Sequence, residues 1–252
     1  PVYCRYCFRR ERVGAGDGML TEAQLDAAIA YFASHKEIRE VILSGGDPLM
    51  LSPRRLGAIV ARLSAIGHID LLRIHTRVPV ATPEAIAAPL LAALRSDTPT
   101  WVVMHANHAR EITDAVRAGV RKFLAEGMPV LSQSVLLAGV NDSVAALEEL
   151  FRTLLAARVK PYALHQLDAA PGTARFHVPL ERGRALVAAL RGRVPGHAIP
   201  HYLLDIPGGH GKVPGLALPL LGAVVILVVL WFNVKDAETW LAAPLLGLYW
   251  CA

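Results

Sequence analysis

The sequence has little of what would place it in several large classes of protein. It contains only three cysteines, an odd and low number that argues against a disulfide framework and for a reducing compartment. Its N-terminus lacks a charged segment followed by an apolar run, so we expect no signal peptide. Its lysines and arginines are scattered rather than gathered in blocks, so a net charge of +5 does not indicate a nucleic-acid surface. We therefore expect a cytoplasmic protein that does not bind nucleic acid.

Apolar sequence, by contrast, is plentiful. Of the 252 residues, 54% are hydrophobic, which is enough for one large α/β domain. Short apolar runs alternate with helical patterns from residue 20 to about residue 205. We expect strands at 41–45, 71–77, 100–106, 128–137, 159–167 and 201–205. We expect helices from Thr21 to about His35, from Ser52-Pro53, from Thr82-Pro83, at about 110–126, from Asp142 to about Ala157, and at 180–193.

This alternation predicts βαβ units and a parallel sheet. Because five or six units follow one another, we predict an α/β fold, a partial (β/α)6 barrel of the TIM type whose first strand is missing from the chain. Polar residues follow each predicted strand, in the strings SGGDP, HTR, HANH, SQS, HQLD and DIPGGHGK. Since barrels carry their chemistry at the carboxyl ends of the strands, we expect these residues to share one active site.

The character of the sequence changes after Pro214, so we divide the chain into a barrel domain at 1–214 and an apolar tail at 215–252. Residues 216–232 carry no charge, and their number is at the lower limit for a transmembrane helix. Two interpretations stay open. The segment is either such a helix or a read-through or frame-shifted extension without an evolved role. Only the first would bring the protein to a membrane.

Two cysteines near the start of the chain, Cys4 and Cys7, form a Cys-x-x-Cys pair among arginines. Such a pair suits a zinc ion, a thiol redox couple or an iron–sulfur cluster. No second pair of this kind is present to complete a zinc site, and a thioredoxin-like pair would lie between a strand and a helix. A cluster held by three cysteines fits best, and we expect its first ligand directly before Pro1.

Two strings, CRYCFRR at 4–10 and SGGDPL at 44–49, resemble the radical S-adenosylmethionine (SAM) superfamily. Five further blocks narrow the resemblance to the lysine 2,3-aminomutase family: RIHTRVPV, HANHARE, SQSVLLAGVND, KPYALHQLD and DIPGGHGKVP. The resemblance implies a barrel of the radical SAM type. It also implies a [4Fe–4S] cluster, SAM and pyridoxal 5′-phosphate (PLP) as cofactors. The implied activity is an isomerase that converts L-lysine to β-lysine by moving the amino group from Cα to Cβ.

The resemblance also implies which residues bind the cluster and SAM. Cys4 and Cys7 would be the second and third cluster ligands. The residues that would bind SAM are Gly45, Gly46 and Asp47 at one strand end, and His105 and Gln133 at two others. Glycines let a backbone approach a ligand closely, and a carboxylate offsets the ammonium group of SAM.

For PLP and the substrate, the resemblance implies five further roles. Lys212, in a glycine-rich segment, would attach PLP covalently, and Arg77 would hold the PLP phosphate. Arg9 would pair with the substrate carboxylate, for which a planar guanidinium is suited. Asp168 and Asp205 would bind the ε-ammonium of lysine, because two carboxylates in one pocket need a cation between them. Three histidines without an assigned role are expected to hydrogen-bond within loops: His108, His165 and His210.

Two alternatives stay open beside an enzyme that acts on free lysine. The first is a relative with the same chemistry that supplies β-lysine for the modification of elongation factor P. LHQLD is closer to that branch of the family, whereas PGGHGK looks more like the enzymes that act on free amino acids. A non-catalytic, membrane-tethered remnant would explain the apolar tail. As partners we expect lysine, an electron donor such as flavodoxin or ferredoxin, and a second copy of the chain.

Overall fold

The computed structural model of the chain describes residues 4–7, 20–205 and 212–215. These residues contain one sheet of seven strands that follow one another in space as they do in sequence. The strands are β1 (Glu40–Leu43), β2 (Leu71–Thr76), β3 (Thr100–His105), β4 (Val130–Val135), β5 (Lys160–His165), β6 (His201–Asp205) and β7 (Lys212–Pro214). Strands β1 to β6 are parallel, and β7 pairs antiparallel with β6. The predicted α/β fold with a partial barrel is confirmed.

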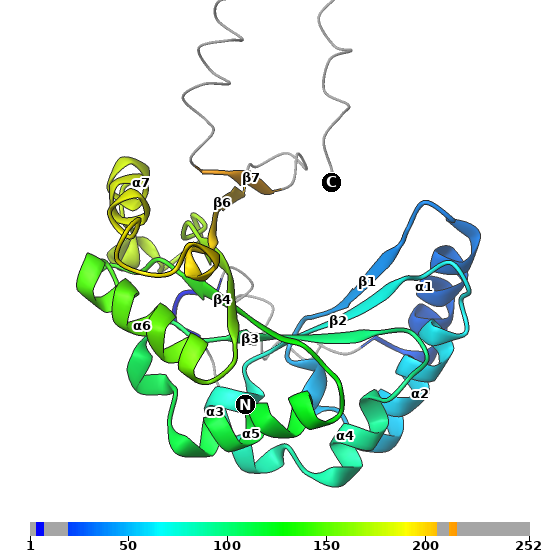
Figure 1. The fold of residues 1–252 in the computed structure, drawn as a ribbon. Coiled ribbons are helices and arrows are strands. Elements are labelled where there is room, and N and C mark those ends of the chain that lie inside the picture. The colour runs from blue at the N-terminus through cyan, green and yellow to red at the C-terminus, as the bar shows by residue number, and fades with distance from the viewer. Residues whose placement is uncertain (1–3, 8–19, 206–211, 216–252) are drawn as a thin grey trace, which may run out of the picture.

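The sheet curls into a half-barrel, and the helices cover its outer face (Figure 1). They are α1 (Glu22–Ser34), α2 (Pro53–Ser64), α3 (Val78–Ala81), α4 (Ala88–Leu94), α5 (Asp114–Ala125), α6 (Val144–Ala156) and α7 (Leu180–Ala189). Short 3-10 turns occupy several loops: η1 (Pro48–Met50), η2 (Pro83–Ala85), η3 (Ala109–Glu111), η4 (Ala174–Phe176) and η5 (Gly196–Ala198). Each connection between parallel strands thus crosses on the convex side and leaves the concave side open.

Side-chain caps explain where several helices begin. The Thr21 hydroxyl accepts from the backbone N–H of Gln24 at 3.2 Å, and the Gln24 side chain accepts from the N–H of Thr21 at 2.9 Å. This reciprocal pair satisfies two N–H groups that the helix itself leaves unpaired. Ser52 caps α2 in the same way, with Pro53 at the first helical position. The helix starts predicted at Thr21 and Ser52 are confirmed.

The prediction of a helix that begins at Thr82-Pro83 is wrong. Only a 3-10 turn, η2, follows Thr82, and α4 begins later at Ala88. Ile86 is fully buried and lies so close to Gly119 of α5 that a Cβ there would come within 2.7 Å of it. The chain therefore leaves the helical path to pack Ile86 into the core, and tertiary packing overrides the local start signal.

Alternation along the strands separates the core from the site. In β2, Leu72 and Ile74 are fully buried, whereas Arg73 and His75, which alternate with them, are not. Because successive side chains of a strand point to opposite faces, the leucine and isoleucine pack under the helices and the polar pair points to the concave face. The concave face of the half-barrel therefore carries the polar groups.

The predicted transmembrane segment at 216–232 lies outside the described residues. Within the parts of the chain that the structure describes, no helix has both the length and the apolar character needed to cross a membrane. The division at residue 214 stays a prediction.

Candidate active site

Cys4 and Cys7 lie in one short turn, in which the N–H of Cys7 donates to the carbonyl oxygen of Cys4 at 3.1 Å. Both side chains are partly exposed. Two thiols on one turn suit an iron–sulfur cluster, which is held by cysteine thiolates. Among the described residues, no group of three or more metal-ligating side chains comes together. The assignment of Cys4 and Cys7 as two cluster ligands stays a prediction.

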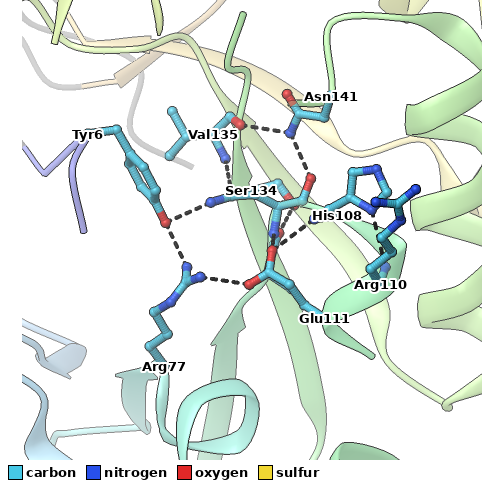
Figure 2. A network of polar contacts seen from close by, with 10 residues as sticks. Tyr6, Arg77, His108, Arg110, Glu111, Ser134, Val135 and Asn141 are labelled. Carbon is cyan, nitrogen blue, oxygen red and sulfur yellow. Dashed lines mark hydrogen bonds and ion pairs between the residues drawn. The ribbon is translucent and has the colours of Figure 1, made fainter. Parts of the chain in front are cut away.

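One of the two residues between these cysteines, Tyr6, is hydrogen-bonded to residues at the ends of two strands (Figure 2). Its hydroxyl oxygen accepts from Nη1 of Arg77 at 2.7 Å and from Nδ2 of Asn107 at 2.6 Å. Arg77 follows β2 and Asn107 follows β3. Burial raises the pKa of the Tyr6 hydroxyl above its usual value, although the positive charge of Arg77 opposes this. The turn with the two cysteines is thus fastened over the carboxyl ends of the sheet.

Glu111 links the Arg77 side chain to the backbone of the loop after β3. Its Oε2 accepts from Nη2 of Arg77 at 2.6 Å. Its Oε1 accepts from the backbone N–H groups of Asn107 and His108 at 2.7 and 2.9 Å. Nδ2 of Asn141 donates to the carbonyl oxygens of Asn107 and Val135, both at 2.9 Å, and so joins the ends of β3 and β4. None of Tyr6, Asn107, Glu111 and Asn141 was predicted as a site residue.

A signal for part of this network is present in the sequence. His108 and Glu111 stand three residues apart in HANHARE, and in the structure they cap η3 reciprocally. The expectation that His108 hydrogen-bonds within a loop is confirmed by its Nδ1, which accepts from the N–H of Arg110 at 3.2 Å. The contacts of Tyr6, which span 71 and 101 residues, have no such local signal.

The SGGD segment that follows β1 borders open space. A Cβ at Gly45 or Gly46 would meet no atom within 4 Å, so a ligand can approach the backbone there. Gly45 has a φ of +122°, which favours glycine. The carboxylate of Asp47 accepts from the hydroxyl of Thr76 at 2.8 Å and from the N–H of Arg77 at 2.7 Å. Asp47 therefore joins the end of β1 to the end of β2 in the structure.

Four polar side chains from neighbouring strands lie on the concave face: His75, His105, Gln133 and His165. His105 and Gln133, both predicted to bind SAM, are register partners on β3 and β4. The rings of His75 and His105 meet edge to face with their centroids 5.7 Å apart. The Nε2 atoms of both rings are buried and have no hydrogen-bond partner within the described residues. Such atoms are suited to a ligand that supplies the missing partner.

Burial keeps these histidines neutral. It lowers the pKa of His105 to about 3 and the pKa values of His75 and His165 to about 4. The prediction that His165 hydrogen-bonds within a loop is wrong, because this residue ends β5 and is largely enclosed. Its position at a strand end was the signal that could have identified it.

Lys212, on β7, forms an ion pair with Asp205, on β6, with Nζ and Oδ2 3.2 Å apart. The two residues are register partners, and each side chain is about half exposed. The charge of Lys212 contributes, after burial, to the lowered pKa values of His75 and His165 on the concave face. Asp168 belongs to the same group, since burial raises its pKa while Lys212 opposes the rise.

Lys212 and Asp205 thus form an ion pair, and the charges of both act on the pKa of Asp168. The predicted roles of these three residues stay predictions, and Arg9 and His210 lie outside the described residues. Two hollows lie among the described residues. One of about 440 Å³ is lined by Cys4, Tyr6, Arg77, Val80, Asn107, Leu137 and Phe176, among others. The second, of about 490 Å³, is lined mainly by apolar residues between Leu167 and Ala174, with Asp168 and His177 as its charged or ionisable groups.

Known proteins resemble this chain in sequence and in fold. The model of the radical SAM superfamily matches residues 1–152. The chain is 38% identical to the L-lysine 2,3-aminomutase of Fusobacterium nucleatum over 213 residues, which are 84% of the chain and 50% of that relative. It is 41% identical to a putative L-lysine 2,3-aminomutase of Aquifex aeolicus, with 84% of the chain and 58% of that relative covered.

A glutamate 2,3-aminomutase of Clostridioides difficile is 35% identical, again over 84% of the chain and 50% of the relative. The chain spans about half the length of the curated relatives it matches. Among solved structures, a radical SAM methyltransferase from Sphaerobacter thermophilus has a TM-score of 0.53 at 20% identity and covers 80% of this chain and 62% of its own. SuiB of Streptococcus suis has a TM-score of 0.55 at 14% identity, with 81% and 47% covered. These two likenesses concern the fold alone.

Proposed function

The chain belongs to the radical SAM superfamily, and we propose that within it the protein is a PLP-dependent 2,3-aminomutase that converts L-lysine to β-lysine. The observation that carries the proposal is the grouping of Lys212, Asp205 and Asp168 beside the concave face of the half-barrel. A lysine in a glycine-rich segment provides an amine for covalent attachment of PLP. Two carboxylates next to it provide a site for a cationic substrate.

The residues near the first hollow fit a cluster and SAM. Cys4 and Cys7 would bind the cluster, and the hollow that Cys4 lines would hold the adenosyl part of SAM. Gly45 and Gly46 leave room for the amino end of SAM, and His105 and Gln133 would contact it from neighbouring strands. When bound, the cluster and SAM supply the radical that removes a hydrogen atom from the substrate, and PLP supplies the ring over which the unpaired electron spreads during amino migration.

The residues near Lys212 fit PLP less completely. The positive charge of Lys212 helps to lower the pKa values of His75 and His165, and Arg73 adds to this effect at His75, so both rings stay neutral near this amine. The role of Arg77 at the PLP phosphate stays a prediction. In the structure the guanidinium of Arg77 is bound by Tyr6 and Glu111, so a phosphate would compete with the Glu111 carboxylate for it.

The carboxylates favour lysine over glutamate as the substrate. The ε-ammonium of lysine would be bound by Asp168 and Asp205, and the second hollow, which is mainly apolar, suits its methylene groups. A glutamate side chain would bring a third carboxylate to this position, where like charges repel. Arg9 would hold the substrate carboxylate at the other end. In the absence of substrate, Lys212 provides the cation that Asp205 needs.

The test is an assay of the full gene product that carries this chain, loaded with iron, sulfide and PLP under anaerobic conditions. With SAM, a flavodoxin or ferredoxin system as electron donor, and L-lysine, we expect β-lysine and 5′-deoxyadenosine. With L-glutamate we expect at least tenfold less product. Formation of β-lysine only on elongation factor P, and not as the free amino acid, would favour the translation-factor branch. Absence of bound iron after reconstitution would contradict the enzyme and favour a non-catalytic remnant.

A further inference from the structure

We propose that Tyr6 is a positioning residue for the cluster, whose hydroxyl donates a hydrogen bond to Sγ of Cys4. This bond would orient one cluster ligand and raise the reduction potential of the cluster. The inference rests on the proposed function in one respect, because it takes Cys4 as a cluster ligand.

The hydrogen-bonding capacity of Tyr6 leads to this assignment. A phenolic hydroxyl has one proton to donate and two lone pairs that accept. The guanidinium of Arg77 can only donate, and its Nη1 lies 2.7 Å from the hydroxyl oxygen. Nδ2 of Asn107, at 2.6 Å, also can only donate. The orientation of this amide is fixed, since Oδ1 of Asn107 accepts from the N–H of Val135 at 2.8 Å. Both lone pairs of the Tyr6 hydroxyl are therefore used, and its proton must find another acceptor.

The candidate acceptor is the side chain of Cys4, which lies two residues before Tyr6 on the same turn and lines the same hollow. In agreement with this, a hydrogen bond with the Cys4 side chain is among the causes that raise the pKa of Tyr6. A thiolate is a better acceptor than a thiol because it is charged. The bond would therefore strengthen when Cys4 binds iron.

The hydroxyl is held firmly enough to act in this way. Arg77 is fixed at its backbone by Asp47, whose carboxylate accepts its N–H at 2.7 Å, and at its guanidinium by Glu111 at 2.6 Å. Glu111 is itself fixed by backbone N–H groups of Asn107 and His108. Arg77 and Glu111 are each about one-fifth exposed, so water competes little with these contacts. The position of the Tyr6 oxygen is thus set by two strand ends rather than by the cysteine turn alone.

A hydrogen bond to a cluster sulfur stabilises the reduced state, which carries more negative charge. Tyr6→Phe removes the donor and keeps the ring. We expect the reduction potential of the variant to fall by at least the equivalent of a tenfold change in the ratio of oxidised to reduced cluster, about 59 mV for one electron. We also expect the turn to loosen, since Arg77 and Asn107 lose their acceptor.

The experiment compares Tyr6→Phe with Tyr31→Phe, which removes a hydroxyl from an exposed tyrosine on α1. An anaerobic redox titration followed by electron paramagnetic resonance measures the potential of the reconstituted proteins. Hydrogen exchange at the amide of Cys7, which bonds to Cys4, is measured on the cluster-free chains. A lower potential and faster exchange in Tyr6→Phe, with neither change in Tyr31→Phe, would support the proposal.

An unchanged potential in Tyr6→Phe would overturn the proposal, whatever the exchange shows. If the Tyr6→Phe variant takes up no cluster, its potential cannot be compared, and hydrogen exchange at the amide of Cys7 is the deciding measurement. An exchange rate equal to that of the wild-type protein would then overturn the proposal. The two failures are distinguishable. A wild-type protein that binds no iron contradicts the proposed function, whereas a wild-type cluster with an unaltered potential in the variant contradicts the role of Tyr6 alone.

Discussion

The Nζ atom of Lys212 lies 3.2 Å from Oδ2 of Asp205, across the antiparallel pairing of β6 and β7. The two residues are seven positions apart in sequence and directly opposite in register. Because β7 runs back along β6, the amine returns to the strand end that carries the carboxylate. This return brings the amine of Lys212 and the carboxylate of Asp205 to one place, and the first two predictions depend on it.

The first prediction concerns the covalent attachment of PLP. Borohydride treatment after addition of PLP should label Lys212 in the wild-type protein, and Lys212→Ala should lose at least nine-tenths of the label, since the amine is removed. Peptide mass spectrometry identifies the labelled residue. The control is Lys160→Ala, at the opposite end of a strand, where Nζ donates to the carbonyl of Pro161 at 2.8 Å. Full labelling of Lys212→Ala would contradict the assignment.

A second prediction concerns the recognition of lysine. Asp205→Asn and Asp168→Asn should each weaken lysine binding by about 1.5–3 kcal/mol, or roughly 10- to 150-fold, because each removes a charged hydrogen-bond acceptor. Calorimetry on the PLP-loaded protein without an electron donor measures binding without turnover. Asp97→Asn, in an exposed loop between α4 and β3, is the matched control and should bind lysine normally. Unchanged affinity in both site variants would exclude these carboxylates as the ammonium site.

Stability should depend on pH through the buried histidines. The pKa of His105 is about 3 in the folded protein, compared with the ordinary value of 6.5. Below pH 6.5, and down to about pH 3, His105 binds a proton in the unfolded chain but not in the folded protein. The free energy of unfolding should therefore be highest above pH 6.5 and fall as pH decreases, by up to about 1.4 kcal/mol per pH unit for each such group.

Urea denaturation between pH 7 and pH 4.5 measures this dependence. His105→Asn should show a shallower loss of stability than the wild-type protein, because one titrating ring is gone. His197→Asn, in the exposed turn η5, should match the wild-type slope. Equal slopes for all three proteins would show that His105 is not held neutral by folding.

Glu111 should contribute strongly to stability although it is not expected to touch the substrate. Glu111→Ala leaves the Arg77 charge and two backbone N–H groups without their partner, so we expect a loss of about 3–5 kcal/mol. Chemical denaturation measures the loss. Asp70→Asn breaks the ion pair with Arg39, whose side chains are both more than half exposed, and should cost no more than about 1 kcal/mol. Similar losses in both variants would contradict the role of Glu111.

The sequence predicted the strand ends and most helices because their signals are local. Thr21 with Gln24 and Ser52 with Pro53 are capping patterns within four residues, and a run such as 101–104 is apolar throughout. Strand β7 was missed because three residues after a glycine-rich segment have no periodicity. Its pairing with β6 depends on the tertiary structure, as does the shift of α4 caused by Ile86.

For the site, the residue types and the strand ends were predictable, but the contacts among them were not. Asp47 was predicted to offset an ammonium group, and its carboxylate also binds Thr76 and the N–H of Arg77. The contacts of Tyr6 with Arg77 and Asn107, and of Glu111 with Arg77, were missed because these partners are far away in sequence. Hydrogen bonds between distant loops leave no pattern in the chain.

The most direct test of the account follows the hydrogen atom on Cβ of the substrate. The reconstituted full gene product is incubated with SAM, PLP, an electron donor and L-lysine that carries deuterium at Cβ, and mass spectrometry locates the label. We predict deuterium in both 5′-deoxyadenosine and β-lysine, and neither product in Lys212→Ala. Unlabelled 5′-deoxyadenosine formed without β-lysine would contradict the proposed aminomutase.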